Sequence, residues 1–340
     1  MTISEEQYHS VLDIIASACR VARAVQKDLP NLRQLTKDDR SPVTVADFAV
    51  QAIVALGLRD ALGPQLIVGE ENADELRTPG PEQNPIRQAV LDAVRLVYPD
   101  LTLEEMLDAI DLCNHDATSS IYWTLDPIDG TKGFLRGQQY AIALGKIENG
   151  QVTFGVMGCP NLSADQTRSL DQPDEHGVMY AATASSGTWE HLIDRLDSEP
   201  RRVRAGDIRP GQPIRTCGSV EKSHSKLSDT MRILEHLNED STPVRLDSQC
   251  KYAVVARNQA DAYLRMPIGA DYVEKIWDHA AGMLIASEAG AVVSDITGKP
   301  LDFSRGWRLE TNRGVICAAE GLHSRIIEAI DALGIAPTAI

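Results

Sequence analysis

The chain has 340 residues, of which 43% are hydrophobic and 24% charged, and its formal net charge is −16. This length and balance are those of a folded protein large enough for two packed layers. So negative a surface argues against general binding to nucleic acid, because neutralising backbone phosphates supplies most of that affinity. An anionic substrate would therefore need local cations or a metal ion to hold it.

The cysteines and the apolar segments indicate the compartment. The sequence has six scattered cysteines without a Cys-x-x-Cys pair, so a zinc knuckle or dithiol redox site has no support. Scattered thiols fit a reducing compartment. Because the sequence shows no signal peptide, no transit peptide and no apolar run of about 18 residues, we expect a protein of the cytoplasm, or of cytoplasm and nucleus, with no membrane partner. The sequence leaves the oligomeric state open.

The start of the chain predicts two helices and a strand. Ser4 and Gln7 have capping-box spacing, and apolar residues then repeat at helical intervals. A second helix is expected over about 46–62. The β-type run 65–69 then places Glu70 at its end.

Residues 72–120 differ in character from what precedes them. They open with several prolines and continue with two amphipathic patterns, near 86–97 and 103–112. This predicts a helical insertion between two strands. The second of these strands, 121–125, ends at Asp126.

The remaining chain alternates strands with helices and contains no internal repeat. We expect strands at 140–146, 151–157, 215–220, 244–246, 261–264, 291–295 and 314–318, and helices at 226–237, 278–289 and 322–333. This alternation predicts an α/β or layered α+β fold. A loose boundary near Pro160 would divide it into an N-terminal α+β metal-binding half, 1–160, and a C-terminal α/β substrate-binding half, 161–340.

The most informative stretch is the segment Asp126-Pro127-Ile128-Asp129-Gly130-Thr131. Pro127 is expected to turn the chain out of the strand, so that Asp126 and Asp129 converge on one cation. With the Ile128 carbonyl between them, they offer the oxygen ligands that Mg²⁺ prefers. The amides of Gly130 and Thr131 can bind phosphate oxygens. Taken alone, the same segment fits a tight turn equally well.

Three further acids stand in segments that suggest a site. Glu70 follows an apolar run, Asp278 stands at the expected start of a helix, and Asp47 lies in the first turn of another. Each also has an ordinary structural explanation: a solvated strand end, an N-cap and a first-turn acid. Spacing alone does not show that these acids meet in space.

Three ordered motifs together resemble the lithium-sensitive, magnesium-dependent phosphatase superfamily: Gly69-Glu70-Glu71, Asp126–Thr131 and Trp277-Asp278-His279-Ala280-Ala281-Gly282. Its members include inositol monophosphatase, fructose-1,6-bisphosphatase and 3′(2′),5′-bisphosphate nucleotidase. The resemblance covers most of the chain. It implies alternating layers of helices and sheets, an α-β-α-β-α sandwich, with the active site between two halves.

The resemblance also implies roles for individual residues. Two or three Mg²⁺ ions would be held by Glu70, Asp126, the Ile128 carbonyl, Asp129 and Asp278. Asp47 and Thr131 would position and deprotonate the attacking water. Li⁺ is expected to inhibit by displacing one Mg²⁺.

The second half resembles one branch of this superfamily, the bisphosphate nucleotidases, in Val220–Ser225, Leu246–Tyr252 and Ala262–Pro267. These enzymes act in sulfur assimilation and remove the 3′-phosphate of adenosine 3′,5′-bisphosphate, and often that of its 5′-phosphosulfate analogue. A second phosphate needs cations away from the metals, and these segments supply a histidine, a lysine and an arginine. The expected substrate site comprises Gly130, Thr131, His224, Ser248, Lys251, Arg265 and Asp278.

Two other readings remain open at this point. An inositol polyphosphate 1-phosphatase or inositol monophosphatase would share the metal site but bind a substrate without a base. Competition by adenosine 5′-monophosphate would distinguish it. A catalytically silent sensor of nucleotide or metal belongs to a different class. The presence of both Asp47 and Thr131 argues against it, because a silent protein need not keep a water activator.

Overall fold

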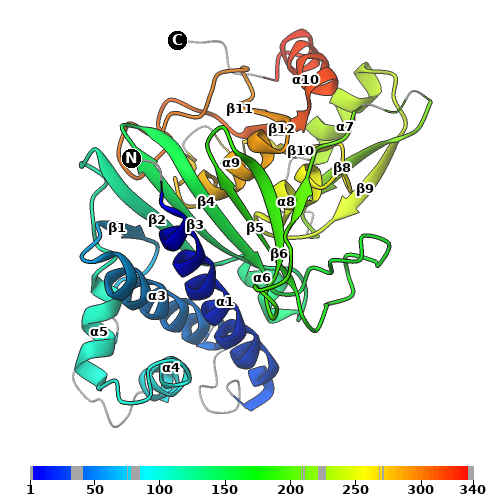
Figure 1. Cartoon of the computed structure of the whole chain (residues 1–340). Coiled ribbons are helices and arrows are strands. Elements are labelled where there is room, and N and C mark those ends of the chain that lie inside the picture. Colours follow the sequence, from blue (N-terminus) through cyan, green and yellow to red (C-terminus); the bar gives the residue numbers. More distant parts are fainter. Residues whose placement is uncertain are drawn as a thin grey trace.

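The described residues form two β-sheets that are each covered by helices (Figure 1). The computed structural model describes residues 3–31, 41–74, 76–77, 85–207, 209, 211–220, 227–267, 269 and 272–335. No described helix combines the length and the apolar character that crossing a membrane requires.

The first sheet has seven strands in chain order, and the second has five in the order β11-β12-β10-β8-β9. The first contains β1 (Ile67–Gly69), β2 (Ile121–Asp129), β3 (Ala141–Glu148), β4 (Gln151–Cys159), β5 (Val178–Thr183), β6 (Gly187–Leu192) and β7 (Arg201–Val203). The second contains β8 (Ile214–Gly218), β9 (Ser241–Arg245), β10 (Ala262–Arg265), β11 (Ala291–Ser294) and β12 (Val315–Ala319). In the first sheet, β1 and β2 run parallel and the other neighbours antiparallel.

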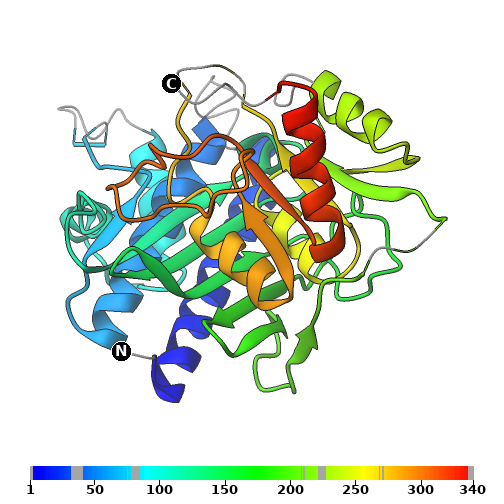
Figure 2. The same cartoon turned by 90° about the horizontal axis from the view of Figure 1, so that it is seen from above.

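The helices form three layers around these sheets, as Figures 1 and 2 show from two directions. One outer layer contains α1 (Glu5–Lys27), α3 (Ser41–Leu62), α4 (Pro85–Arg95) and α5 (Leu103–Asp111). The middle layer contains α8 (Cys250–Ala256) and α9 (Ala280–Glu288), which pack between the sheets. The other outer layer contains α7 (Leu227–His236) and α10 (Glu320–Ala332).

Strand alternation explains why each sheet can serve two layers. In β3, Ile142 and Leu144 join the core beneath α1 and α3, whereas Ala141 and Ala143 join the core that contains α8 and α9. Successive strand residues point to opposite faces, so a strand buried on both sides is apolar throughout. A third core fills the space between the second sheet and the helices α7 and α10. The expected α-β-α-β-α layering is therefore confirmed.

Most expected elements are confirmed, including the capping box of Ser4 and Gln7 and the two helices of the insertion. We expected Pro127 to end the strand, and this was wrong because β2 continues to Asp129. The pairing of β2 with β3 shifts register between Asp126 and Asp129, and such a bulge accommodates a residue without an N–H.

Two further expectations need correction. The boundary expected near Pro160 falls inside the first sheet, between β4 and β5, and the chain passes to the second sheet only between β7 and β8. The helix expected from Asp278 begins at Ala280, so Asp278 precedes its N-cap residue, His279. Asp278 is therefore not an ordinary N-cap.

Candidate active site

The parallel pairing of β1 with β2 brings two of the predicted acids together. Gly69 is the partner of Leu125 in this register, so the next residues along the two strands are Glu70 and Asp126. Glu70 directly follows the last residue of β1, and Asp126 stands inside β2, so the parallel register places the two residues next to each other. Partial burial and the charges of Asp278 and Glu71 raise the pKa of Glu70 to about 8, although its side chain reaches the surface.

Asp126 is the most constrained of the acids, with only 2% of its surface exposed. Burial raises its pKa well above the usual value, and the charges of Asp129 and Glu70 raise it further. Its Oδ1 atom has no hydrogen-bond partner among the described residues. A buried carboxylate oxygen without a donor is costly, and a bound cation is the usual compensation. The residues present therefore fit a hard divalent cation.

The end of β2 is held against the segment that precedes α8. Asp129 Oδ2 accepts a hydrogen bond of 2.6 Å from the backbone N–H of Gln249. Gly130 has φ 89°, and a Cβ atom there would lie 2.7 Å from Cβ of Ser248. Only glycine suits this left-handed turn at such close approach. Thr131 then begins the short helix α6 (Thr131–Leu135).

Asp47 approaches the cluster from α3. Its side chain is buried, and burial together with the charges of Glu71 and Glu70 raises its pKa well above the usual value. One turn later on the same helix face, Gln51 accepts from the Glu71 backbone N–H at 3.1 Å and donates to the Glu71 carbonyl at 2.6 Å. Gln51 thus fixes the turn after β1 relative to Asp47.

Asp278 belongs to an ion-pair network with Arg265 and Glu274. Arg265, at the end of β10, binds the Glu274 carboxylate through Nε at 2.9 Å and Nη2 at 2.8 Å. The same Nη2 lies 3.6 Å from Asp278 Oδ2. Burial raises the pKa of Asp278 to about 6, against the opposing influence of Arg265 and His279. Burial would also raise the pKa of Glu274, but its hydrogen bond with His279 and the Arg265 charge lower it to about 2.

Among the described residues, one group of three candidate metal ligands has its ligand atoms all within 4.8 Å of one another: Glu274, Asp278 and His279. Their contacts argue against a metal at that point. Glu274 is paired with Arg265, and His279 is held between Glu274 at 3.2 Å and the Tyr252 hydroxyl at 2.8 Å. The predicted ligands Glu70, Asp126, Asp129 and Asp278 are not such a compact group among the described residues. The charge of Asp129 nevertheless raises the pKa values of the other three.

A cavity of about 520 Å³ brings two of these acids, Asp129 and Asp278, together with two of the predicted cations, Lys251 and Arg265. Seven of the predicted residues line it: Asp129, Gly130, Thr131, Ser248, Lys251, Arg265 and Asp278. Its remaining lining residues are Lys132, Gly218, Ser219, Asp247, Gln249, Tyr263, Leu264 and Tyr272. The other predicted residues, Asp47, Glu70, Asp126 and Ile128, lie outside this lining, and His224 lies outside the described residues.

Lys251 is unusual because it is a lysine whose side chain is almost fully buried. Burial lowers the pKa of its ammonium group, while Asp129 and Asp247 act in the opposite direction. Its Nζ lies 5.3 Å from the centre of the Tyr263 ring and 3.5 Å from the Leu246 carbonyl oxygen. A cation held this way is available to an anion that enters the cavity.

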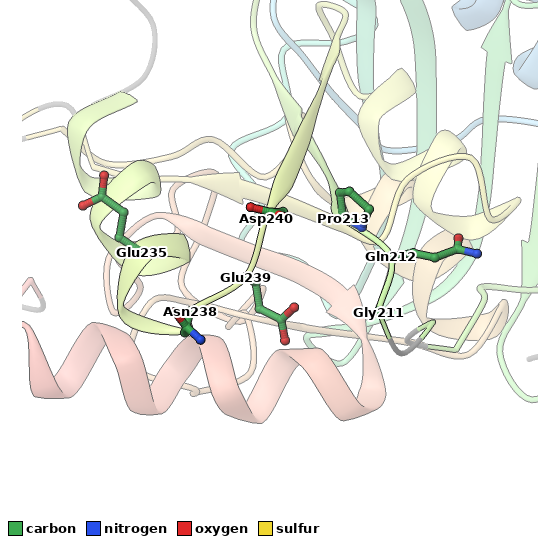
Figure 3. A pocket seen from close by; sticks show the side chains of 7 residues that line it. All are labelled: Gly211, Gln212, Pro213, Glu235, Asn238, Glu239 and Asp240. Atoms are coloured by element: carbon green, nitrogen blue, oxygen red, sulfur yellow. The ribbon is translucent and has the colours of Figure 1, made fainter.

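A second cavity, of about 530 Å³, lies at the far edge of the second sheet (Figure 3). Its lining includes Glu235, Glu239 and Asp240, and Glu239 forms an ion pair of 2.6 Å with Arg325 of α10. None of the predicted site residues lines this cavity. The described lining of this cavity has acids without a lysine or arginine, whereas Lys132, Lys251 and Arg265 line the cavity beside Asp129 and Asp278. The latter therefore suits a phosphorylated substrate better.

Comparison with known proteins identifies the family of this chain. The model of the inositol monophosphatase family matches residues 4–334, and the chain therefore belongs to that family. A 3′(2′),5′-bisphosphate nucleotidase of Schizosaccharomyces pombe is 42% identical over 306 residues, covering 88% of this chain and 86% of its own. The 3′(2′),5′-bisphosphate nucleotidase 2 of Candida albicans is 36% identical over 358 residues, covering 97% and 99%.

Solved structures support the fold. The extragenic suppressor protein SuhB of Bartonella henselae aligns with a TM-score of 0.60 at 18% identity over 95% of this chain and 97% of its own. CysQ of Bacteroides thetaiotaomicron, a bacterial member of the same family, aligns with a TM-score of 0.59 at 18% identity over 92% and 96%. The family consists of metal-dependent phosphatases that generally use Mg²⁺.

Several residues that shape the site were not identified from the sequence. These are Gln51, Lys132, Asp247, Gln249, Tyr272 and Glu274. Gln249 stands inside a motif quoted above but carries no recognisable chemistry of its own. Glu274 precedes Asp278 by four residues, and nothing in that spacing indicates that it binds Arg265.

Proposed function

We propose that this chain is a magnesium-dependent phosphomonoesterase that hydrolyses the 3′-phosphate of adenosine 3′,5′-bisphosphate to give adenosine 5′-monophosphate. It would act in the same way on the 5′-phosphosulfate analogue. The observation that carries this proposal is a cavity whose lining combines the acids Asp129 and Asp278 with the cations Lys251 and Arg265. The relatives named as 3′(2′),5′-bisphosphate nucleotidases support the substrate class.

The metal-binding role falls to the acid cluster. Glu70, Asp126, Asp129 and Asp278, with the Ile128 carbonyl, provide enough oxygen ligands for two or three Mg²⁺ ions, one of which Li⁺ would displace. When bound, Mg²⁺ neutralises phosphate charge and lowers the pKa of water. The unpartnered Oδ1 of Asp126 supports its assignment as a ligand.

Two residues are assigned to the attacking water. Burial and neighbouring negative charge raise the pKa of Asp47 well above its usual value, so its carboxylate holds a proton more readily than an exposed one. Thr131 lines the cavity at the start of α6, where its hydroxyl can orient the water. The water oxygen would attack phosphorus in line while Asp47 receives one proton of the water. The bond to the ribose 3′-oxygen breaks, and that oxygen takes up a proton from solvent to become the 3′-hydroxyl.

The rest of the substrate is assigned to the cavity. Lys251 supplies a buried point charge for the second anionic group, and Ser248 and the Gly130 amide offer hydrogen bonds. Arg265 already pairs with Glu274, so it presents the remaining edge of its guanidinium to the substrate. His224 keeps its expected role in this proposal, although it lies outside the described residues.

The test is phosphate release from adenosine 3′,5′-bisphosphate with Mg²⁺, with and without millimolar Li⁺, beside inositol 1,4-bisphosphate. We expect fast, Li⁺-sensitive release that yields adenosine 5′-monophosphate. Release from the inositol substrate alone would keep the metal site and overturn the roles of Ser248, Lys251 and Arg265. No release from either substrate, in a preparation that binds Mn²⁺, would favour a silent sensor.

A further inference from the structure

Gln249 occupies a position between the two halves of the acid cluster. It is the N-cap residue of α8, only 3% of its surface is exposed, and it lines the cavity. No part of the proposed chemistry requires an amide at this place. Its burial therefore calls for another explanation, and its hydrogen bonds provide one.

Three hydrogen bonds connect Gln249 to both sides of the site. Its backbone N–H donates to Asp129 Oδ2 at 2.6 Å. Its side-chain Nε2 donates to the Trp277 carbonyl at 2.9 Å, and its Oε1 accepts from the Gly282 N–H at 3.3 Å. One residue thus contacts a predicted ligand on β2 and both flanks of the segment that carries Asp278.

Only an amide of this length satisfies both side-chain partners. The Trp277 carbonyl requires a donor and the Gly282 N–H requires an acceptor, so a carboxylate or a thioether would leave one of them unpaired. The helices α8 and α9 pack closely here, because a Cβ atom on Gly282 would lie 2.3 Å from the Tyr252 ring. Gln249 adds two hydrogen bonds beside this contact and so links the start of α8 to both flanks of Asp278.

This restraint matters because the carboxylates it connects repel each other. Asp129 and Asp278 repel each other as carboxylates and stand 149 residues apart in the chain, so only tertiary contacts keep them close. Replacing a residue that hydrogen-bonds to a metal ligand without contacting the metal typically weakens metal binding about 10- to 100-fold.

We propose that Gln249 is a positioning residue that holds Asp129 and Asp278 at the separation a divalent cation requires. The inference rests on the metal site of the proposed function and not on its substrate. It assigns Gln249 no contact with the reacting atoms. Its effect is on metal affinity, with a secondary effect on turnover.

The experiment measures Mn²⁺ binding by calorimetry on substrate-free wild type, Gln249→Met and the shorter amide variant Gln249→Asn. Gln259→Met is the matched control, because Gln259 also accepts one hydrogen bond, from Arg257 Nε, and donates one, to the Gln166 carbonyl, each at 2.6 Å. We expect the Mn²⁺ Kd to rise about tenfold or more in both Gln249 variants and to stay within twofold of wild type in the control.

Phosphate release by the same variants provides a second measurement. In the Gln249 variants the Mg²⁺ concentration for half-maximal rate should rise by a similar factor, with kcat recovering at saturating Mg²⁺. A merely structural role would lower kcat at every Mg²⁺ concentration and leave the Mn²⁺ Kd unchanged, which would overturn the inference. Wild type that binds no Mn²⁺ would overturn both the metal site and the role of Gln249. Wild type that binds Mn²⁺ without releasing phosphate would refute the proposed activity alone.

Discussion

Replacing Asp126 by Asn should change stability and activity in opposite directions. In the metal-free chain the Asp126 carboxyl is 2% exposed, has an unpartnered Oδ1 and stands among other acids. The Asn amide removes the charge and can donate to neighbouring carboxylates. An unsatisfied buried group costs about 1–3 kcal/mol, so we expect the free energy of unfolding in EDTA to rise by about this amount.

Adding Mn²⁺ should reverse the order. A ligand at 100 times its Kd stabilises a protein by about 2.7 kcal/mol, and Asp126→Asn should lose most of this stabilisation together with its metal affinity. We expect kcat/KM with Mg²⁺ to fall at least about 100-fold. Chemical unfolding with EDTA and with Mn²⁺, beside phosphate release, measures all three effects.

Asp295→Asn is the matched control. Asp295 is equally buried, at 1% exposure, but it accepts hydrogen bonds from Thr297 N, Lys299 N and the Asn312 side chain. Its replacement should destabilise the chain by about 1–3 kcal/mol in both conditions and leave the Mn²⁺ Kd unchanged. If Asp126→Asn instead behaved like this control, or kept wild-type turnover, the assignment of Asp126 as a metal ligand would be wrong.

Three further predictions follow from the charges around the cavity. Lys251→Met should raise KM for adenosine 3′,5′-bisphosphate about tenfold and change KM for adenosine 3′-monophosphate much less, because the latter lacks the second phosphate. Equal increases in KM for both substrates in steady-state assays would exclude Lys251 as the residue that binds the second phosphate. The pKa of Glu70 is about 8 and that of Asp278 about 6, so both carboxyl groups lose protons as pH rises from 6 to 8.5. Mn²⁺ affinity measured by calorimetry should therefore increase about tenfold or more over this range. An affinity that does not change with pH would contradict their role as ligands. The pKa of Glu274 is depressed from 4.5 to about 2, so its contribution of about 3 kcal/mol is present above pH 4.5 and lost as pH falls towards 2. Unfolding of wild type and Glu274→Gln should therefore differ at pH 6 and converge near pH 2. A constant difference would refute the His279 hydrogen bond and the Arg265 charge as its source.

Local sequence patterns determined most of the elements and several site residues. Helical periodicity and capping residues located α1, α4 and α5, because these signals depend on neighbours within one or two turns. The apolar runs before Glu70 and Asp126 located β1 and most of β2 for the same reason. Motif resemblance then indicated the family, which the comparison with known proteins confirmed.

The tertiary structure decided how these pieces act together. The parallel register of β1 and β2 brings Glu70 beside Asp126, and the fold turns Arg265 towards Glu274. Gln249 shows the limit of prediction from the sequence most clearly, since its hydrogen-bond partner Asp129 lies 120 residues away in the chain. Hydrogen bonds and charge interactions depend on distance in space over a few ångströms, and a sequence pattern records only neighbours along the chain.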